Sequence, residues 1–204
     1  MRVEQLNSDG WAKTYLLVDD DSKDAILIDP VYDFTEHYLE ILEQNGLNLV
    51  KSIATHTHAD HITGCFTLKD KTGCDYLMWE STASLGVSKY VNESTKITFA
   101  NLDMNFHHVP GHTQDSMLVE IGNYVFTGDF LFTGEGGVGR DDLPSGRIED
   151  HWKSLSVLSK LSGDLIVCTG HEPPGTEMRT LDWNRKNNPI LNMQSEHEYY
   201  HWQI

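Results

Sequence analysis

The chain has 204 residues, of which 39% are hydrophobic and five are tryptophan, so it can bury a substantial core. We expect one domain spanning residues 1–204. The formal net charge of −16 at pH 7 excludes an extended basic surface of the kind that binds nucleic acid. A small anionic substrate remains compatible, because a metal ion and one arginine can make a pocket locally positive.

Features that would place the chain outside the cytoplasm are not evident in the sequence. The first residues, Met1-Arg2-Val3-Glu4-Gln5, do not read as a secretory signal, and no apolar run approaches membrane-spanning length. The cysteines, Cys65, Cys74 and Cys168, are odd in number and lack CxxC spacing, which disfavours a disulfide scaffold. We expect a cytoplasmic protein without a membrane partner. An organelle is the alternative if a transit peptide has been removed.

Strands and helices alternate in the first half of the chain. Apolar runs at 14–18 and 25–28, separated by an acidic turn, predict an antiparallel strand pair. Apolar spacing predicts a helix at 34–44, closed by Asn45-Gly46, and a second helix at 62–71. Buried strands are expected at 49–54 and 74–78, and a short helix at 80–85.

The second half of the chain is richer in strands. They are expected at 96–99, 104–109, 117–121 and 124–127, the last two joined by a Gly122-Asn123 turn. Five glycines predict a long loop at 134–146, followed by a helix at 149–161, a strand at 164–168 and a helix at 180–186. Several strand connections are too short for parallel crossovers, which favours an α/β layered sandwich over a doubly wound sheet.

A dense group of ligand-type residues follows the strand at 49–54. His56, His58, Asp60 and His61 fall within six positions. Neutral imidazole and carboxylate are the side chains that bind Zn, Fe, Mn and Co. A polar loop with incidental histidines would explain one or two of these residues but explains the whole His-x-His-x-Asp-His pattern poorly. The pattern therefore predicts a metal site.

Three more ligand-type residues follow strand ends next to glycine or threonine, namely His112, Asp129 and His171. Loops at strand ends are where a rigid scaffold holds functional residues. Either histidine alone could be structural, but the repeated placement favours a shared centre with the His-rich group. The pair His107-His108 competes weakly, because adjacent strand residues point to opposite faces.

These motifs together resemble the metallo-β-lactamase superfamily. The residues that carry the resemblance are His56-Thr57-His58-Ala59-Asp60-His61, Gly111-His112-Thr113, Thr127-Gly128-Asp129 and Gly170-His171. The resemblance implies an αββα four-layer sandwich, with two mixed β-sheets flanked by helices and a metal site at one sheet edge. Within the superfamily, Gly139-Arg140-Asp141-Asp142 and the run from Ala25 to Val31 resemble the persulfide dioxygenases.

The resemblance to persulfide dioxygenases implies an iron enzyme. Such an enzyme would oxidise glutathione persulfide, or a similar low-molecular-weight persulfide, with O2 to sulfite and thiol. One Fe(II) per chain would be held by His56, His112 and Asp129. Two histidines and one carboxylate on one face of Fe(II) leave three positions open, enough for O2 and a substrate sulfur. Arg140 would contact the glutathione.

The remaining ligand-type residues would then have a supporting role. His58, Asp60, His61 and His171 would surround the iron site or form a second metal site. Asp60 and His61 would be catalytic, by holding an iron-bound water or orienting ligands through hydrogen bonds.

The chain departs from the persulfide dioxygenase pattern at three places. Gln114-Asp115-Ser116 follows His-Thr, where the family usually has proline, and the glycine-rich segment before Arg140 lacks the usual cysteine. Glu172-Pro173 replaces the usual Asp-Tyr after the last histidine. The missing tyrosine removes a hydroxyl from the site and leaves the thiol carrier open.

The alternative function is that of a glyoxalase II-type hydroxyacylglutathione hydrolase with two Zn, Fe or Mn ions. One ion would bind His56, His58 and His112, the other Asp60, His61 and His171, with Asp129 bridging. All seven residues are present, and a bridging hydroxide would attack the thioester. A di-iron electron-transfer protein is disfavoured, because His58 stands where such members carry a carboxylate.

Other residues have structural explanations. A buried structural thiol is expected for Cys65, and a structural or supporting role for Asp29. The aromatic residues of the tail, Tyr199, Tyr200 and Trp202, indicate packing or an oligomer contact, so a homodimer is one expectation.

Overall fold

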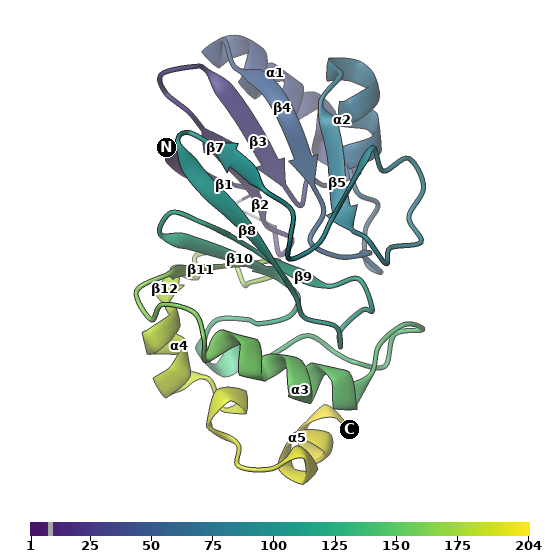
Figure 1. Ribbon diagram of the computed structural model, residues 1–204, viewed down its shortest axis with the longest axis vertical. Helices are drawn as coiled ribbons and strands as arrows, with labels where there is room; N and C mark the ends of the chain where they lie inside the picture. The colour runs from purple at the N-terminus through teal and green to yellow at the C-terminus, as the bar shows by residue number, and fades with distance from the viewer. Residues whose placement is uncertain (8–9) are drawn as a thin grey trace.

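The computed structural model describes residues 1–7 and 10–204, and these form two stacked β-sheets with helices on both outer faces (Figure 1). The first sheet has the order β1-β2-β3-β4-β5-β6, and the second has the order β12-β11-β10-β9-β8-β7. Both sheets are mixed: β3 to β6 pair in parallel, as do β10 and β11, and the other pairs are antiparallel. The expected αββα sandwich is confirmed.

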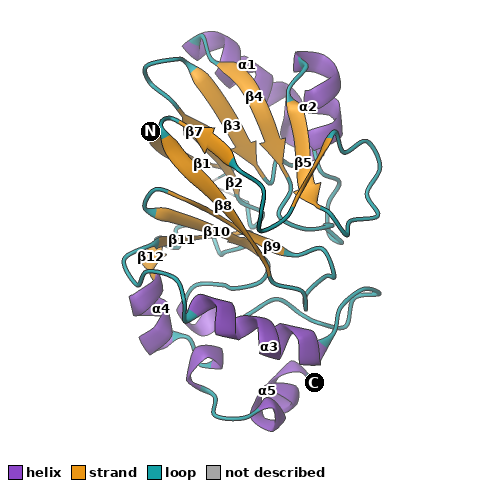
Figure 2. Cartoon of the chain, viewed as in Figure 1, coloured by secondary structure: helices purple, strands orange, loops and turns teal. Residues whose placement is uncertain are grey.

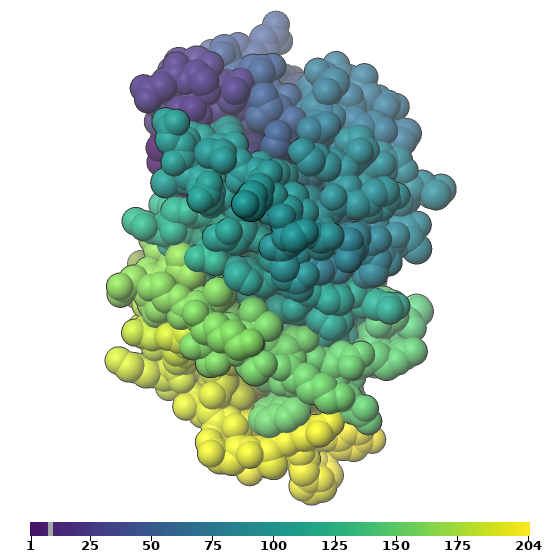
Figure 3. Space-filling view, viewed as in Figure 1, coloured from purple at the N-terminus to yellow at the C-terminus, as the bar shows by residue number. Residues whose placement is uncertain are grey.

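The strands of the first sheet are β1 (Arg2–Leu6), β2 (Thr14–Val18), β3 (Asp24–Ile28), β4 (Asn48–Ile53), β5 (Asp75–Trp79) and β6 (Lys89–Val91). The strands of the second sheet are β7 (Ile97–Phe99), β8 (Leu102–His108), β9 (Met117–Ile121), β10 (Tyr124–Gly128), β11 (Ile166–Thr169) and β12 (Arg179–Thr180). Each half of the chain thus builds one sheet, and the two halves form the upper and lower parts of the molecule in Figure 3.

Helices cover the outer face of each sheet (Figure 2). The first sheet carries α1 (Thr35–Asn45) and α2 (Cys65–Thr72). The second sheet carries α3 (Ile148–Leu158), α4 (Leu181–Asn187) and α5 (Glu196–Gln203). Short 3-10 turns lie at Tyr32–Phe34, Gly134–Gly136 and Ile190–Asn192. None of the helices in the described part of the chain has the length and apolar character needed to cross a membrane.

The main core lies between the two sheets, where alternate residues of the strands face one another. At its centre Tyr15 and Phe126 meet edge to face, with ring centroids 5.3 Å apart. Separate apolar clusters fill the space under α1 and the space under α3, α4 and α5. This packing gives a rigid frame, whose strand ends carry the polar loops.

Most expected elements are found at the expected places, two expectations differ from the structure, and β1, β6, β12 and α5 are not among the expected elements. Residues 80–85 form turns instead of a helix, because the side chain of Thr82 accepts a hydrogen bond from the backbone of Ser84. The second helix begins at Cys65, after Gly64, and not at residue 62. The tail, for which no element is expected, contains α5, whose first turn is capped by the side chain of Ser195, which accepts from the backbone N–H of Glu198.

We predict that Phe126→Ala lowers the free energy of unfolding by about 3–5 kcal/mol, because it leaves a cavity between two rigid sheets. Phe126 is only 1% exposed. Leu85→Ala is the matched control, since Leu85 is 89% exposed and its truncation should change stability by less than about 0.5 kcal/mol. Urea unfolding followed by tryptophan fluorescence measures both. Equal effects of the two substitutions would contradict this description of the core.

Candidate metal centre

The ends of three strands meet at one edge of the two sheets. His56 follows β4, Asp129 follows β10, and His171 follows β11. The close approach requires glycine at Gly128, which has φ +50°, because a Cβ atom there would lie 2.3 Å from the hydroxyl oxygen of Thr55. His112 enters from the loop between β8 and β9. Segments far apart in sequence thus deliver four ligand-type side chains to one place.

His56 is held in a defined tautomer. Its Nδ1 lies 3.0 Å from the hydroxyl of Thr55, which donates in turn to a carboxylate oxygen of Asp29 at 2.8 Å. The hydroxyl oxygen therefore accepts from His56 Nδ1, and Nε2 is left without a proton. Within residues 1–7 and 10–204, Nε2 has no hydrogen-bond partner although it is buried. A buried, unpartnered lone pair of this kind suits a metal ligand.

His112 has the same arrangement. Its Nδ1 donates to the backbone carbonyl of Arg140 at 2.7 Å, so Nε2 again carries the lone pair. Nε2 of His112 lies 3.6 Å, and Nε2 of His56 lies 3.8 Å, from the same carboxylate oxygen of Asp129. Two ligand atoms on one ion are at most about 4.2 Å apart, twice a metal–nitrogen bond of about 2.1 Å. The three donor atoms therefore lie within reach of a single ion.

The protonation of this group suits a cation. Burial, followed by the neighbouring rings of His58 and His112, holds the pKa of His56 well below its ordinary value. Burial likewise lowers the pKa of His112, against the opposing effect of Asp129. Both imidazoles are therefore neutral at physiological pH, the form that binds metals.

A second donor group lies beside the first and is more exposed. Ligand atoms of His58, Asp60 and His61 lie within 4.8 Å of one another. Both ring nitrogens of His58 and Nε2 of His61 are buried and make no hydrogen bond in the part of the chain that is described, and Nε2 of His58 lies 3.4 Å from a carboxylate oxygen of Asp29. Asp60, by contrast, has a side chain that is half exposed. The second group is therefore also able to hold an ion, at the mouth of the site.

His171 links the two groups. Its Nδ1 donates to Asp129 at 2.7 Å and its Nε2 donates to Asp60 at 2.8 Å. Burial lowers the pKa of His171, but the two carboxylates outweigh burial and raise it to about 10. Without an ion, His171 is thus a cation between two anions. The structure places it in neither of the two donor groups, and His58 lies with Asp60 and His61.

The donor groups open into a cavity of about 540 Å³. Phe132, Leu143 and Ala59 give it an apolar side, and Arg140 stands at its rim. The side chain of Arg140 is 68% exposed, and its guanidinium makes two hydrogen bonds to the carboxylate of Asp142, at 2.5 and 2.6 Å. A surface pair of this kind contributes little energy, so Arg140 can exchange Asp142 for a substrate carboxylate.

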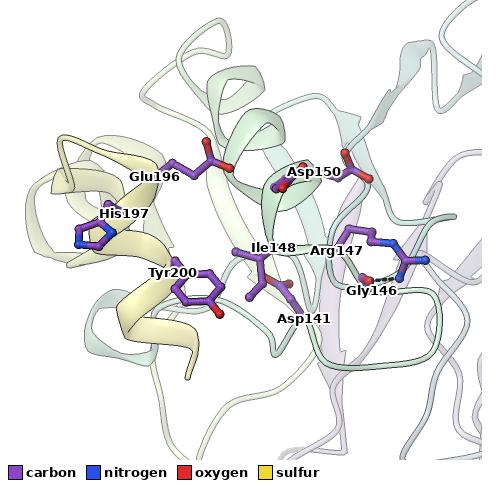
Figure 4. Close-up of a pocket in the computed structure, with 9 residues that line it drawn as sticks. Asp141, Gly146, Arg147, Ile148, Asp150, Glu196, His197 and Tyr200 are labelled. Atoms are coloured by element: carbon purple, nitrogen blue, oxygen red, sulfur yellow. Dashed lines mark hydrogen bonds between the residues drawn. The ribbon is translucent and has the colours of Figure 1, made fainter.

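A second cavity, of about 610 Å³, lies between α3 and α5 and is also lined by Asp141 and Gly146 of the loop that precedes α3 (Figure 4). Its lining includes Glu149, Asp150 and Glu196, and no candidate ligand of either donor group is part of it. The chemistry therefore belongs to the smaller cavity.

Two buried groups near the site are missed by the sequence reasoning. Asp115 accepts from the backbone and hydroxyl of Thr57 and from the hydroxyl of Thr113, so it ties the His-rich loop to the His112 loop. In the sequence it is noted only within Gln114-Asp115-Ser116, the segment that stands where the family usually has proline. His151, which lacks a motif around it, is completely buried against Asp141. A short sequence window carries no signal for either contact.

The other expectations near the site concern Cys65 and Asp29. Cys65 is fully buried, and burial raises the pKa of its thiol to about 12, so it is an unreactive packing residue. Asp29 accepts from both the backbone and the hydroxyl of Thr55 and thereby orients His56. Its role in this structure is to hold Thr55, the residue before His56, by two hydrogen bonds.

Comparison with known proteins agrees with the fold and with the motifs. The family model described as "Metallo-beta-lactamase superfamily" matches residues 9–83 and 86–171. The bovine protein named "Persulfide dioxygenase ETHE1, mitochondrial" is 29% identical over 187 residues, covering 90% of this chain and 72% of the relative, and the Homo sapiens protein gives the same values. "Hydroxyacylglutathione hydrolase GloC" of Haemophilus influenzae is 30% identical, covering 96% of this chain and all of the relative.

Among solved structures, the crystal structure of ETHE1 from Myxococcus xanthus superimposes with a TM-score of 0.91 and 31% identity, covering 100% of this chain and 90% of that one. The sequence, the fold and the arrangement of strand-end residues thus agree on the family. The chain belongs to the metallo-β-lactamase superfamily, and within it the expected likeness to the persulfide dioxygenases is confirmed.

Proposed function

We propose that the protein is a non-haem Fe(II) persulfide dioxygenase. The overall reaction is RSSH + O2 + H2O → RSH + SO3²⁻ + 2H⁺, in which the outer sulfur is oxidised and O2 is reduced. The substrate is glutathione persulfide or a similar low-molecular-weight persulfide. The observation that carries the proposal is the buried set of His56, His112 and Asp129, the one donor group among the described residues whose three members are all buried. The similarity to named persulfide dioxygenases supports it.

Each residue of the site then has a defined task. His56, His112 and Asp129 would hold one Fe(II) per chain, which supplies open positions for O2 and for the persulfide sulfur. His171 and Asp60 hold protons and negative charge at the mouth, and His61 donates to Asp60. The apolar side of the cavity, Phe132 and Leu143, excludes water from the sulfur. Arg140 binds a carboxylate of the thiol carrier.

A glyoxalase II-type hydrolase is the second candidate, favoured by one specific observation. The ring nitrogens of His58 and Nε2 of His61, which make no hydrogen bond within the described residues, form with Asp60 a second group able to hold an ion. A two-metal thioester hydrolase would need that group as well as the first. The identity to GloC supports this candidate to a similar degree by sequence alone. The two candidates differ in the number of ions and in the use of O2.

The setting of the activity follows the sequence expectations. We propose that residues 1–204 form one domain that acts in the cytoplasm, or in an organelle after removal of a transit peptide. We also propose that the protein takes small-molecule partners and no nucleic acid, since its net charge is −16. A homodimer is the oligomeric state to test, by light scattering.

We predict about one iron per chain and O2 uptake that depends on glutathione persulfide, because one buried donor set holds the ion. The measurements are metal analysis of protein produced with iron, together with an oxygen electrode. Asp129→Ala should remove both the metal and the activity. Two ions per chain with cleavage of S-lactoylglutathione and no O2 uptake would instead establish the hydrolase.

We predict that His171→Ala keeps its iron at close to one per chain. The reason is that His171 contacts Asp129 and Asp60 and is not one of the three buried donors. A dinuclear enzyme should lose about one of its two ions in the same variant. His37→Ala, an exposed histidine on α1, is the control for removal of a histidine as such. Metal analysis after gel filtration separates the two outcomes.

We predict that Arg140→Ala raises KM for glutathione persulfide about fivefold with little change in kcat, since an exposed charge pair contributes about 1 kcal/mol. Arg140 lies at the rim of the cavity, away from the reacting sulfur. Lys153→Ala, which removes an exposed charge from α3, should leave both constants unchanged. An unchanged KM in Arg140→Ala would make Arg140 a solvated loop charge. Steady-state O2 uptake gives both constants.

A further inference from the structure

The candidate ligand His112 depends on a backbone carbonyl that belongs to a loop. Its Nδ1 donates to the carbonyl of Arg140, in the stretch between η2 (Gly134–Gly136) and α3. No strand ladder or helix fixes that carbonyl within the described residues 139–142. The side chain of Arg140 points to solvent and cannot fix it either. Some other contact must hold the loop for His112 to keep its orientation.

The contact is the neighbouring side chain, Asp141, which is 4% exposed. One carboxylate oxygen accepts from Nδ1 of His151 at 2.5 Å. The other accepts from the hydroxyl of Tyr199 at 2.6 Å and from the amide of Gln203 at 2.8 Å. Three donors from two helices, α3 and α5, therefore converge on one buried carboxylate. Burial, followed by the negative charge of Asp141, raises the pKa of Tyr199, so its hydroxyl remains a donor.

His151 extends the network to the second side of the site. Its Nε2 donates to the backbone carbonyl of Phe130 at 2.9 Å, and its ring stacks on that of Phe130. Phe130 directly follows the candidate ligand Asp129. Both ring nitrogens of His151 face oxygen atoms, so hydrogen bonds hold the ring at both ends. The pair is completely enclosed, with His151 0% exposed.

The C-terminal helix α5 completes the network through Tyr199 and Gln203. Gln203 donates to Asp141 and also to the carbonyl of Gly139 at 3.0 Å. Gly139 in turn donates its backbone N–H to the carbonyl of Asp129 and packs against His112. Figure 4 shows Asp141 where the loop, Ile148 of α3 and Tyr200 of α5 meet. In residues 1–7 and 10–204, the side chains of Asp141, His151 and Tyr199 make no hydrogen bond or ion pair with His56, His112 or Asp129.

We propose that Asp141, His151 and Tyr199 are positioning residues, which set metal affinity by fixing the carbonyl that orients His112 and the backbone beside Asp129. A buried ion pair is weak evidence for stability alone, because desolvation offsets most of its attraction. The buried pair of Asp141 and His151 instead selects one conformation of the loop. The inference rests on the metal centre proposed above and not on the reaction that the centre catalyses.

The test uses the full chain after chelation of its metal, with Zn(II) as the probe. The ion followed is the one whose binding Asp129→Ala abolishes, and its Kd is measured by competition with a chromophoric chelator. We expect Asp141→Asn to raise this Kd at least about tenfold, as changes to the groups that orient metal ligands usually do. Tyr199→Phe, which removes one of three donors and keeps the ring, should raise it a few-fold. Tyr200→Phe, an exposed neighbour on α5, should leave it unchanged.

A second readout separates positioning from stability. The visible absorption of the Co(II)-substituted protein reports ligand geometry, and it should change in Asp141→Asn and Tyr199→Phe at saturating Co(II). A lower Tm of the metal-free variants with unchanged Kd and unchanged Co(II) spectrum would overturn the proposal. If Asp141→Asn does not fold, Tyr199→Phe decides in the same way. Absence of O2 uptake by the parent protein would refute the proposed reaction and leave these affinities interpretable.

Discussion

The site depends on where the protons of two buried imidazoles lie. Thr55 accepts the Nδ1 proton of His56, and the Arg140 carbonyl accepts that of His112. Each hydrogen bond satisfies one nitrogen and turns the other nitrogen, with its lone pair, toward Asp129. A buried polar atom without a partner costs about 1–3 kcal/mol, so the fold maintains the unpartnered Nε2 lone pair of His56 at the expense of stability unless an ion binds it. The metal centre is thus built by the groups behind the ligands as much as by the ligands.

The sheet edge provides the first of these groups through an unusual backbone. Asp29 has φ +51°, a left-handed conformation that a non-glycine residue seldom adopts. Its N–H donates to the carbonyl of Ile53, and its carboxylate accepts twice from Thr55, so β3 and β4 are joined at the point where β4 ends. The strain, of the order of 1–3 kcal/mol, persists because these bonds determine it. The backbone that leads from the end of β4 to His56 is therefore held in place.

Much of this architecture could be predicted from the sequence, and the failures have physical causes. Strands such as 117–121 can be predicted because their apolar residues follow one another in a short stretch of sequence. The His-x-His-x-Asp-His motif can be recognised for the same reason. The helix expected at 80–85 fails because hydroxyl side chains satisfy the backbone in turns there. The contacts of Asp115 and His151 are missed, and Asp141 is noted only as part of the Gly139-Arg140-Asp141-Asp142 motif, because their partners lie in other elements. Long-range hydrogen bonds leave no periodicity in a sequence.

The charge of the buried donors explains how a chain of net charge −16 could bind the anionic persulfide that we propose as its substrate. His56 and His112 are neutral and Asp129 carries one negative charge, so a divalent ion would leave the buried set with a net positive charge. That charge would lie in a site of low dielectric, where interactions are far stronger than at the hydrated surface. In the second group Asp60 is half exposed, and solvent screens its charge. The difference in burial therefore favours the group of His56, His112 and Asp129 as the place where an anionic sulfur would be held. The more exposed group that contains Asp60 would then control protons at the entrance of the site.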